Sequence, residues 1–171
     1  ENGFQIITGD AARAAAEYAA KTAYKETDAA TYQAMEALVH NLNTMNSRAG
    51  AQVPFSSLNY GTDTSPEGRM AVHNLLRATE AGLGDGETPI FPVQIFKVKE
   101  GVNYNEGDPN YDLFRHALRC SAKRLFPNFS FLDAPFNLQY YKPGDYNTEV
   151  AYMGCRTRVM GNVFDLSLIH I

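Results

Sequence analysis

The segment from Glu149 to Val159 brings together a thiol, a glycine and two cations. A short apolar stretch runs into Gly154 and Cys155, and Arg156 and Arg158 follow. Glycine allows a sharp turn or a close backbone approach, and nearby positive charge favours the reactive thiolate form of a cysteine. These residues mark Cys155 as a candidate reactive cysteine, although a free cysteine is more often a small buried hydrophobe.

The other potential ligands and nucleophiles form no recognisable pattern. Cys120 falls inside a helix predicted over residues 109–125, and we expect it to be structural. Two cysteines are too few for a disulfide scaffold, and they do not form a CxxC pair. No two histidines have metal-ligand spacing, so we predict no metal site. The four are His40, His73, His116 and His170.

Composition places the chain among globular proteins. The 171 residues suffice for one domain, and a 44% hydrophobic and 20% charged content excludes a disordered chain. No apolar run approaches the roughly 20 residues of a membrane helix, and we find no signal peptide. The net charge of −4 argues against a nucleic-acid surface. We therefore expect neither a membrane nor a nucleic-acid partner, and the low cysteine count suits a cytoplasmic location.

Both ends are atypical of a complete protein. The chain begins at Glu1 without a methionine and ends within an apolar stretch. We expect residues 166–171 to be a non-native tail, and the rest to be an internal piece of a longer protein.

Periodicity predicts helices alternating with strands, the pattern of an α/β fold with parallel strands. The predicted helices cover 10–24, a stretch from about residue 28, a stretch after Ser65–Pro66 and 109–125. Thr27 or Asp28 would cap the second helix, and Ser65 would cap the third. The predicted strands cover 53–58, 90–98, 129–132 and 150–153, with Pro92 marking a strand start or a bulge.

The apolar faces of two helices provide candidate core residues. The face of the helix after Pro66 comprises Val72, Leu75, Leu76, Thr79 and Leu83. That of the 109–125 helix comprises Phe114, Ala117, Leu118 and Leu125.

Seven sequence segments stand in the order in which one enzyme family carries them. They are His40–Met45, Ser47–Ser57, Asn59–Gly68, Thr88–Pro92, Asp108–Asp112, Lys123–Asn128 and Tyr152–Arg156. They resemble the anaerobic class of ribonucleoside-triphosphate reductase, a glycyl radical enzyme. The resemblance covers nearly all of residues 1–165, which makes it highly specific.

The resemblance implies part of a ten-stranded α/β barrel preceded by N-terminal helices. In that fold a finger loop carries the active cysteine through the barrel centre, and Cys155 stands at the matching position. Residues 1–165 would belong to the catalytic barrel domain. Within it, 1–46 would be helices near the dimer and effector region, and 47–165 would be barrel elements ending in the finger loop.

The resemblance also implies the chemistry. Cys155 would carry a thiyl radical that takes the hydrogen from C3′ of a ribonucleoside triphosphate. The glycyl radical lies elsewhere in the full protein, formate is the expected reductant, and zinc belongs to a C-terminal region outside this chain. Ser56 and Ser57, at the predicted end of strand 53–58, could hold triphosphate oxygens together with the helix capped by Ser65. Serines there are more often turn formers. Arg156 is the third candidate substrate contact.

Regulation and partners follow from the same resemblance. Ser47, Arg48 and Gln52 would belong to the loop that relays the identity of an ATP or deoxynucleotide effector to the substrate site. The family implies a homodimer and a radical S-adenosylmethionine activating enzyme. The isolated piece itself is expected to be inactive.

Two other functions stay open. Another glycyl radical enzyme would commonly carry two adjacent cysteines, whereas Arg156 follows Cys155 here. A nucleotide-binding α/β module without catalysis would bind nucleotides and turn nothing over.

Overall fold

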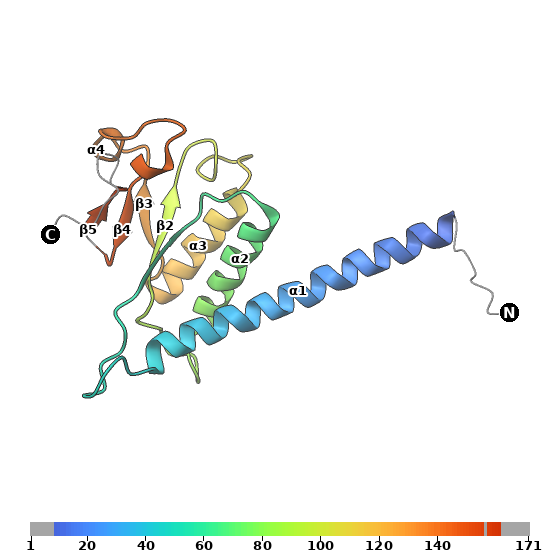
Figure 1. The fold of residues 1–171 in the computed structure, drawn as a ribbon, viewed down its shortest axis with the longest axis horizontal. Helices are drawn as coiled ribbons and strands as arrows, with labels where there is room; N and C mark the ends of the chain where they lie inside the picture. Colours follow the sequence, from blue (N-terminus) through green and yellow to red (C-terminus); the bar gives the residue numbers. More distant parts are fainter. Residues whose placement is uncertain (1–8, 156, 162–171) are drawn as a thin grey trace, which may run out of the picture.

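The computed structural model describes residues 9–155 and 157–161 and confirms an α/β protein. Helices and strands alternate through most of the chain, and a hairpin of two short strands follows (Figure 1). In chain order the elements are α1 Asp10–Thr44, β1 Ser57–Tyr60, α2 Pro66–Ala81, β2 Val93–Val98, α3 Tyr111–Arg124, β3 Asn128–Phe131, α4 Pro135–Leu138, a 3₁₀ turn at Tyr146–Thr148, β4 Ala151–Met153 and β5 Thr157–Val159.

The first three strands form a parallel sheet in the order β1-β2-β3. Asn59, Ile95 and Asn128 lie side by side across it. Helices α2 and α3 make the connections, as parallel pairing requires. The predicted parallel α/β arrangement is therefore confirmed, whereas a ten-stranded barrel stays a prediction.

Helix α1 corrects the prediction of two N-terminal helices. It is one continuous helix of 35 residues, and its N-terminal half projects away from the sheet (Figure 1). The expected cap is wrong because Asp28 lies within the helix, where it accepts a 2.8 Å hydrogen bond from Asn74 and lies 3.5 Å from Arg77. No glycine or proline interrupts residues 10–44, so nothing local ends the helix.

Helix α2 begins as the sequence predicts, but it ends at Ala81, so Leu83 of the predicted face lies beyond it. The Ser65 hydroxyl accepts a 3.0 Å bond from the Gly68 amide, Pro66 occupies the first turn and Gly82 follows the last one. Strand β2 starts directly after Pro92, so this proline precedes the strand, and the predicted range of 90–98 was three residues too long. The first strand was misplaced, because β1 covers 57–60 rather than 53–58.

One face of the sheet packs against α2 and α3. Its central cluster comprises Val72, Leu76, Phe96, Val98, Leu113, Ala117 and Cys120. The predicted face of α3 is partly wrong: Ala117 is fully buried, but Leu118 and Leu125 are 45% and 80% exposed. Leu113, His116 and Cys120 are buried instead, because the helix is rotated relative to the predicted stripe.

A second cluster joins α1 to α2 and to β1. Val39, Leu75 and Ala78 are buried at its centre. Leu58 and Tyr60 of β1 pack against them, so the helices meet this strand on one face. Within the described residues, no helix is long and apolar enough to cross a membrane.

Candidate active site

The face of the sheet opposite the helices is polar in places and carries the candidate site. Side chains alternate along a strand. Leu58 and Tyr60 pack toward the helices, so Ser57 and Asn59 point the other way. The same alternation places Lys97 of β2 opposite the helix-facing Phe96 and Val98.

The β4–β5 hairpin is fastened to this face through two side chains of β1. The Asn59 carboxamide donates a 2.7 Å bond to the Tyr152 carbonyl and accepts a 2.8 Å bond from the Tyr152 amide. The Ser57 hydroxyl accepts a 3.2 Å bond from the Gly154 amide. Strand β4 therefore runs antiparallel to β1, and the turn of the hairpin lies at the amino end of β1.

Cys155 lies in the turn of this hairpin, two residues after the end of β4, as the sequence indicated. Gly154 adopts φ +64°, and an added Cβ would meet the Phe55 ring at 3.1 Å, so glycine suits both the turn and the close approach. The thiol is exposed, so the described residues do not enclose it. Burial of Cys155 inside a barrel stays a prediction that requires cover from outside this chain.

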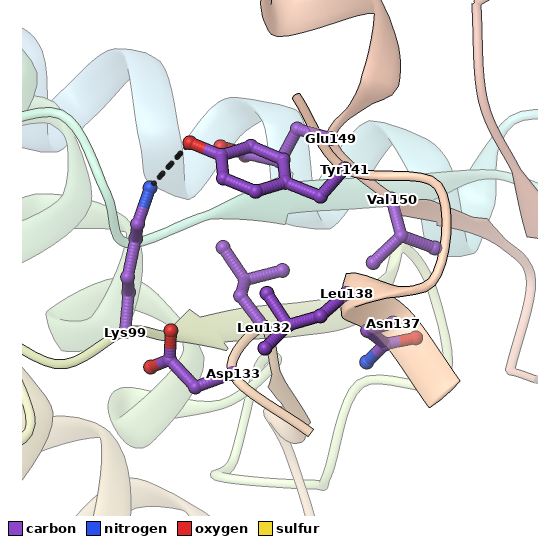
Figure 2. Close-up of a pocket in the computed structure, with 8 residues that line it drawn as sticks. All are labelled: Lys99, Leu132, Asp133, Asn137, Leu138, Tyr141, Glu149 and Val150. Atoms are coloured by element: carbon purple, nitrogen blue, oxygen red, sulfur yellow. Dashed lines mark hydrogen bonds between the residues drawn. The ribbon is translucent and has the colours of Figure 1, made fainter. Parts of the chain in front are cut away.

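Two lysines hold the segment that leads into the hairpin. Lys97 Nζ lies 2.7 Å from Glu149 Oε1, and both side chains are about 15% exposed or less. Lys99 donates a 3.1 Å bond to the Tyr141 hydroxyl, seen as the dashed line in Figure 2. This bond is the main reason that the pKa of Lys99 lies above its ordinary value.

A small cavity lies between Lys99 and the apolar side chains near it. Leu132, Leu138 and Val150 line its floor and side (Figure 2). Its volume of about 10 Å³ is room for about one water molecule, whereas small-molecule sites usually span hundreds of Å³. This region supports the base of the hairpin, and the cavity that the described residues form is too small for a nucleotide.

Of the two arginines near the thiol, the structure places one. Arg158 donates a 2.8 Å bond to the Phe136 carbonyl, and its guanidinium stands over the Phe136 ring at 5.5 Å. It ties β5 to α4 and is not aimed at Cys155. Arg156 lies outside the described residues.

Of the two predicted substrate serines, Ser57 lies beside the thiol turn, but not for the reason proposed. Because β1 begins at Ser57, Ser56 and Ser57 lie at its amino end and not at its carboxyl end. The helix capped by Ser65 starts beyond the other end of β1, about 10 Å away along the strand. The structure thus separates these serines from that helix and brings Ser57 beside Gly154.

The predicted effector loop closes on itself. Ser47 donates to the Gln52 carbonyl through both its amide, at 2.7 Å, and its hydroxyl, at 2.9 Å. The Arg48 guanidinium donates a 2.6 Å bond to the Gln52 side chain. All three predicted residues lie together on an exposed turn, where Ala51 adopts φ +56°, a strained value for a residue with a Cβ.

Cys120 lies on the opposite side of the sheet from Cys155. It is fully buried, its thiol lies 3.7 Å from the Leu76 carbonyl, and burial raises its pKa to about 11. The expectation of a structural cysteine is confirmed.

The structure also brings together His73 and His116, which lie on separate helices. The rings of His73 and His116 are 5.2 Å apart, and His116 Nε2 lies 3.2 Å from Glu80. Burial lowers the pKa of His116 from its ordinary value. His40 is half-buried on α1. The described residues contain no group of three or more side chains able to hold a metal ion.

Sequence reasoning missed Asn59, Lys97 and Glu149. Each contacts a residue more than 50 positions away, so no local spacing reveals the pair. For Lys97 the sequence did offer a signal. A lysine within the apolar run 90–98 needs a partner when it is buried.

The fold and this face together define an α/β protein with a candidate cysteine active site on a hairpin. The family described as anaerobic ribonucleoside-triphosphate reductase matches residues 8–168, and the chain belongs to that family.

Individual relatives carry the same name. The chain is 35% identical to the anaerobic ribonucleoside-triphosphate reductase of Escherichia coli over 127 residues, which is 74% of the chain and 17% of that protein. It is 35% identical to the Salmonella typhimurium protein over 136 residues, 79% of the chain and 18% of that protein. It is 41% identical to the protein of Enterobacteria phage T4 over 107 residues, 62% of the chain and 18% of that protein. The chain thus spans less than a fifth of the length of these relatives.

Proposed function

We propose that this chain is part of the catalytic barrel of a reductase that converts ribonucleoside triphosphates to 2′-deoxyribonucleoside triphosphates for DNA synthesis. The observation that supports it most is the hairpin that presents Cys155 on the sheet face opposite the helices. In a closed barrel with its helices outside, that face would be the interior. The three parallel strands would then be part of a ten-stranded barrel, and the hairpin would be its finger loop.

The proposed chemistry needs a sulfur at that place. A thiyl radical at Cys155 would take the C3′ hydrogen, and the 2′-oxygen would leave as water. A glycyl radical elsewhere in the full protein would supply the radical, and formate would supply two electrons as it becomes carbon dioxide. The protein must hold the ribose at reacting distance and keep water from the intermediate. An exposed thiol meets the second need only when the rest of the barrel covers it.

The substrate site and the effector relay would lie close together in this chain. Ser56, Ser57 and Arg156 are the proposed contacts of the substrate, and Ser57 lies beside the thiol turn. Ser47, Arg48 and Gln52 are the proposed relay from an ATP or deoxynucleotide effector. The loop leads directly into Phe55, whose ring approaches Gly154, which gives the relay a short route.

The assembly follows the same proposal. Residues 1–46 would contribute to the dimer and effector region and 47–165 to the barrel, in a cytoplasmic homodimer activated by a radical S-adenosylmethionine enzyme. The N-terminal half of α1, which projects from the rest, is available for such a contact (Figure 1). The zinc site would lie in a part of the protein outside this chain.

The test uses Cys155→Ala in the full-length, anaerobically activated protein. We expect deoxynucleotide formation to fall to background while calorimetric nucleotide binding is retained. Cys120→Ala is the matched control, and it should retain turnover per folded molecule. Turnover by Cys155→Ala would overturn the proposal. Nucleotide binding without turnover in the activated wild type would favour a binding module.

A further inference from the structure

The Asn59 side chain acts as a peptide group added to the face of the sheet. A carboxamide offers one carbonyl acceptor and N–H donors, the same pair that a peptide unit presents. Asn59 uses both on a single residue, with bonds of 2.7 and 2.8 Å to the carbonyl and amide of Tyr152. It can therefore dock a strand where no backbone partner exists.

This docking determines where the thiol lies along β1. Asn59 binds Tyr152 and, two residues earlier in β1, Ser57 binds Gly154. The residues between them alternate on both chains, so a shift by one position would break both contacts. Cys155 follows Gly154 directly, and its place above the amino end of β1 is therefore set by these two side chains.

Besides these bonds the Phe55 ring approaches Gly154, and the other polar contacts of the hairpin lie away from its turn. Lys97 and Glu149 fasten the chain before β4, and Arg158 fastens β5 to α4. Both lie away from the turn, and the thiol itself is exposed. The described residues give Asn59 two bonds to the hairpin and Ser57 one.

We propose that Asn59 is a positioning residue that sets the reach of the Cys155 thiol to the substrate. The inference rests on the proposed reductase function. Reacting groups must lie within a narrow distance, and a displacement of about 1 Å can lower a rate about 100-fold. Removing the carboxamide would lower kcat while substrate affinity is largely kept.

The experiment compares Asn59→Ala and Asn59→Asp with Asn74→Ala in the full-length, activated protein. Asn74 is a matched control because it is fully buried, bonds Asp28 and Arg77, and lies on α2, across the sheet from the hairpin. The glycyl radical content of each sample is measured by electron paramagnetic resonance, and kcat is expressed per radical.

We expect kcat per radical to fall about 10- to 100-fold in Asn59→Ala, with KM within about threefold of the wild type. Asn59→Asp should fall as well, because its carboxylate can accept from the Tyr152 amide but cannot donate to the carbonyl. Asn74→Ala should keep kcat per radical within about twofold.

Hydrogen exchange of the same proteins distinguishes a local displacement of the hairpin from a general loss of stability. Exchange at the Gly154 amide should speed up in both Asn59 variants, and exchange at the Tyr152 amide should speed up in Asn59→Ala, while the α2 and β2 amides stay protected. If Asn59→Ala does not fold, Asn59→Asp decides the question by the same two readouts. An unchanged kcat per radical in the folded Asn59 variants would overturn the inference, as would an equal fall in Asn74→Ala. Lack of turnover in the wild type would instead overturn the proposed function.

Discussion

The two faces of the parallel sheet are built by different means. On the helix face, Phe96 and Leu76 are fully buried in a continuous apolar cluster, and Cys120 is packed among them. On the hairpin face, polar side chains bind a short hairpin by directional bonds, and Cys155 stays exposed. Alternate residues of the same strands therefore have different tasks. Those on one face pack against the helices, and those on the other face position the hairpin.

This difference has an energetic consequence. Apolar burial contributes roughly 25 cal/mol per Å² and adds up over a large cluster, whereas each hydrogen bond contributes about 0.5–1.5 kcal/mol net. The hairpin depends on few such bonds, so we expect it to open locally at a lower free energy than the helix face. We therefore expect the reactive thiol of Cys155 to lie on a segment that moves easily, and the structural thiol of Cys120 to lie in a rigid core.

The largest expected effect comes from truncating the helix face. Phe96→Ala removes a fully buried ring that contacts Tyr60, Phe114 and Phe129. We expect a loss of about 3–5 kcal/mol in stability. The measurement is hydrogen exchange of the β2 amides in the full-length protein.

The matched substitution on the other face is Phe55→Ala. Its ring is 71% exposed and makes an edge contact with Phe91. We expect a loss below about 1 kcal/mol. Similar losses for the two substitutions would show that the faces do not differ as described.

A smaller effect is expected where the hairpin segment is fastened by charge. Lys97→Met removes the cation that lies 2.7 Å from Glu149, and both side chains are largely buried. We expect a loss of about 1–3 kcal/mol, because an uncompensated charge near the interior is costly. Exchange should increase in β4 more than in β2.

Arg13→Met is the control for this pair. Arg13 lies 3.0 Å from Asp10 on α1, but both side chains are highly exposed. Exposed pairs contribute little, so no measurable change is expected. An equal effect from the two substitutions would mean that burial of the Lys97–Glu149 pair is unimportant.

The smallest effect is a pH dependence on the helix face. Burial lowers the pKa of His116, so the unfolded chain binds the proton more tightly than the folded one. This contribution to stability is present above pH 6.5, the ordinary value, and is lost as the pH falls through the lower folded value. His116→Gln should make stability less sensitive to pH below 6.5. An unchanged slope would show that His116 is not the group responsible.

Local signals in the sequence predicted most of the helix face. Ser65 and Pro66 defined the start of α2, and the spacing of Val72, Leu75 and Leu76 identified its buried side. Such signals act within a few residues, so they are readable in one chain. The single helix α1 was missed because a helix start was placed at Thr27 or Asp28, although no glycine or proline interrupts residues 10–44.

The hairpin face was less predictable. The position of Cys155 after a strand was found, because glycine and the short apolar run are local features. The partners Asn59 and Tyr152 are 93 positions apart, and only folding brings them together. The error in β1 also moved Ser56 and Ser57 to the wrong end of the strand. Strand boundaries set by pairing with β2 cannot be read from β1 alone.

The most direct test of the account is alkylation of the two thiols in the folded full-length protein, followed by peptide mapping. We predict that the reagent, like a substrate, reaches Cys155 in the barrel and reacts there faster than at Cys120, whose thiol is packed among apolar side chains and has its pKa raised to about 11 by burial. A ribonucleoside triphosphate should slow the reaction of Cys155 and leave Cys120 unchanged. Equal rates for the two thiols, or no protection of Cys155 by the nucleotide, would contradict the account.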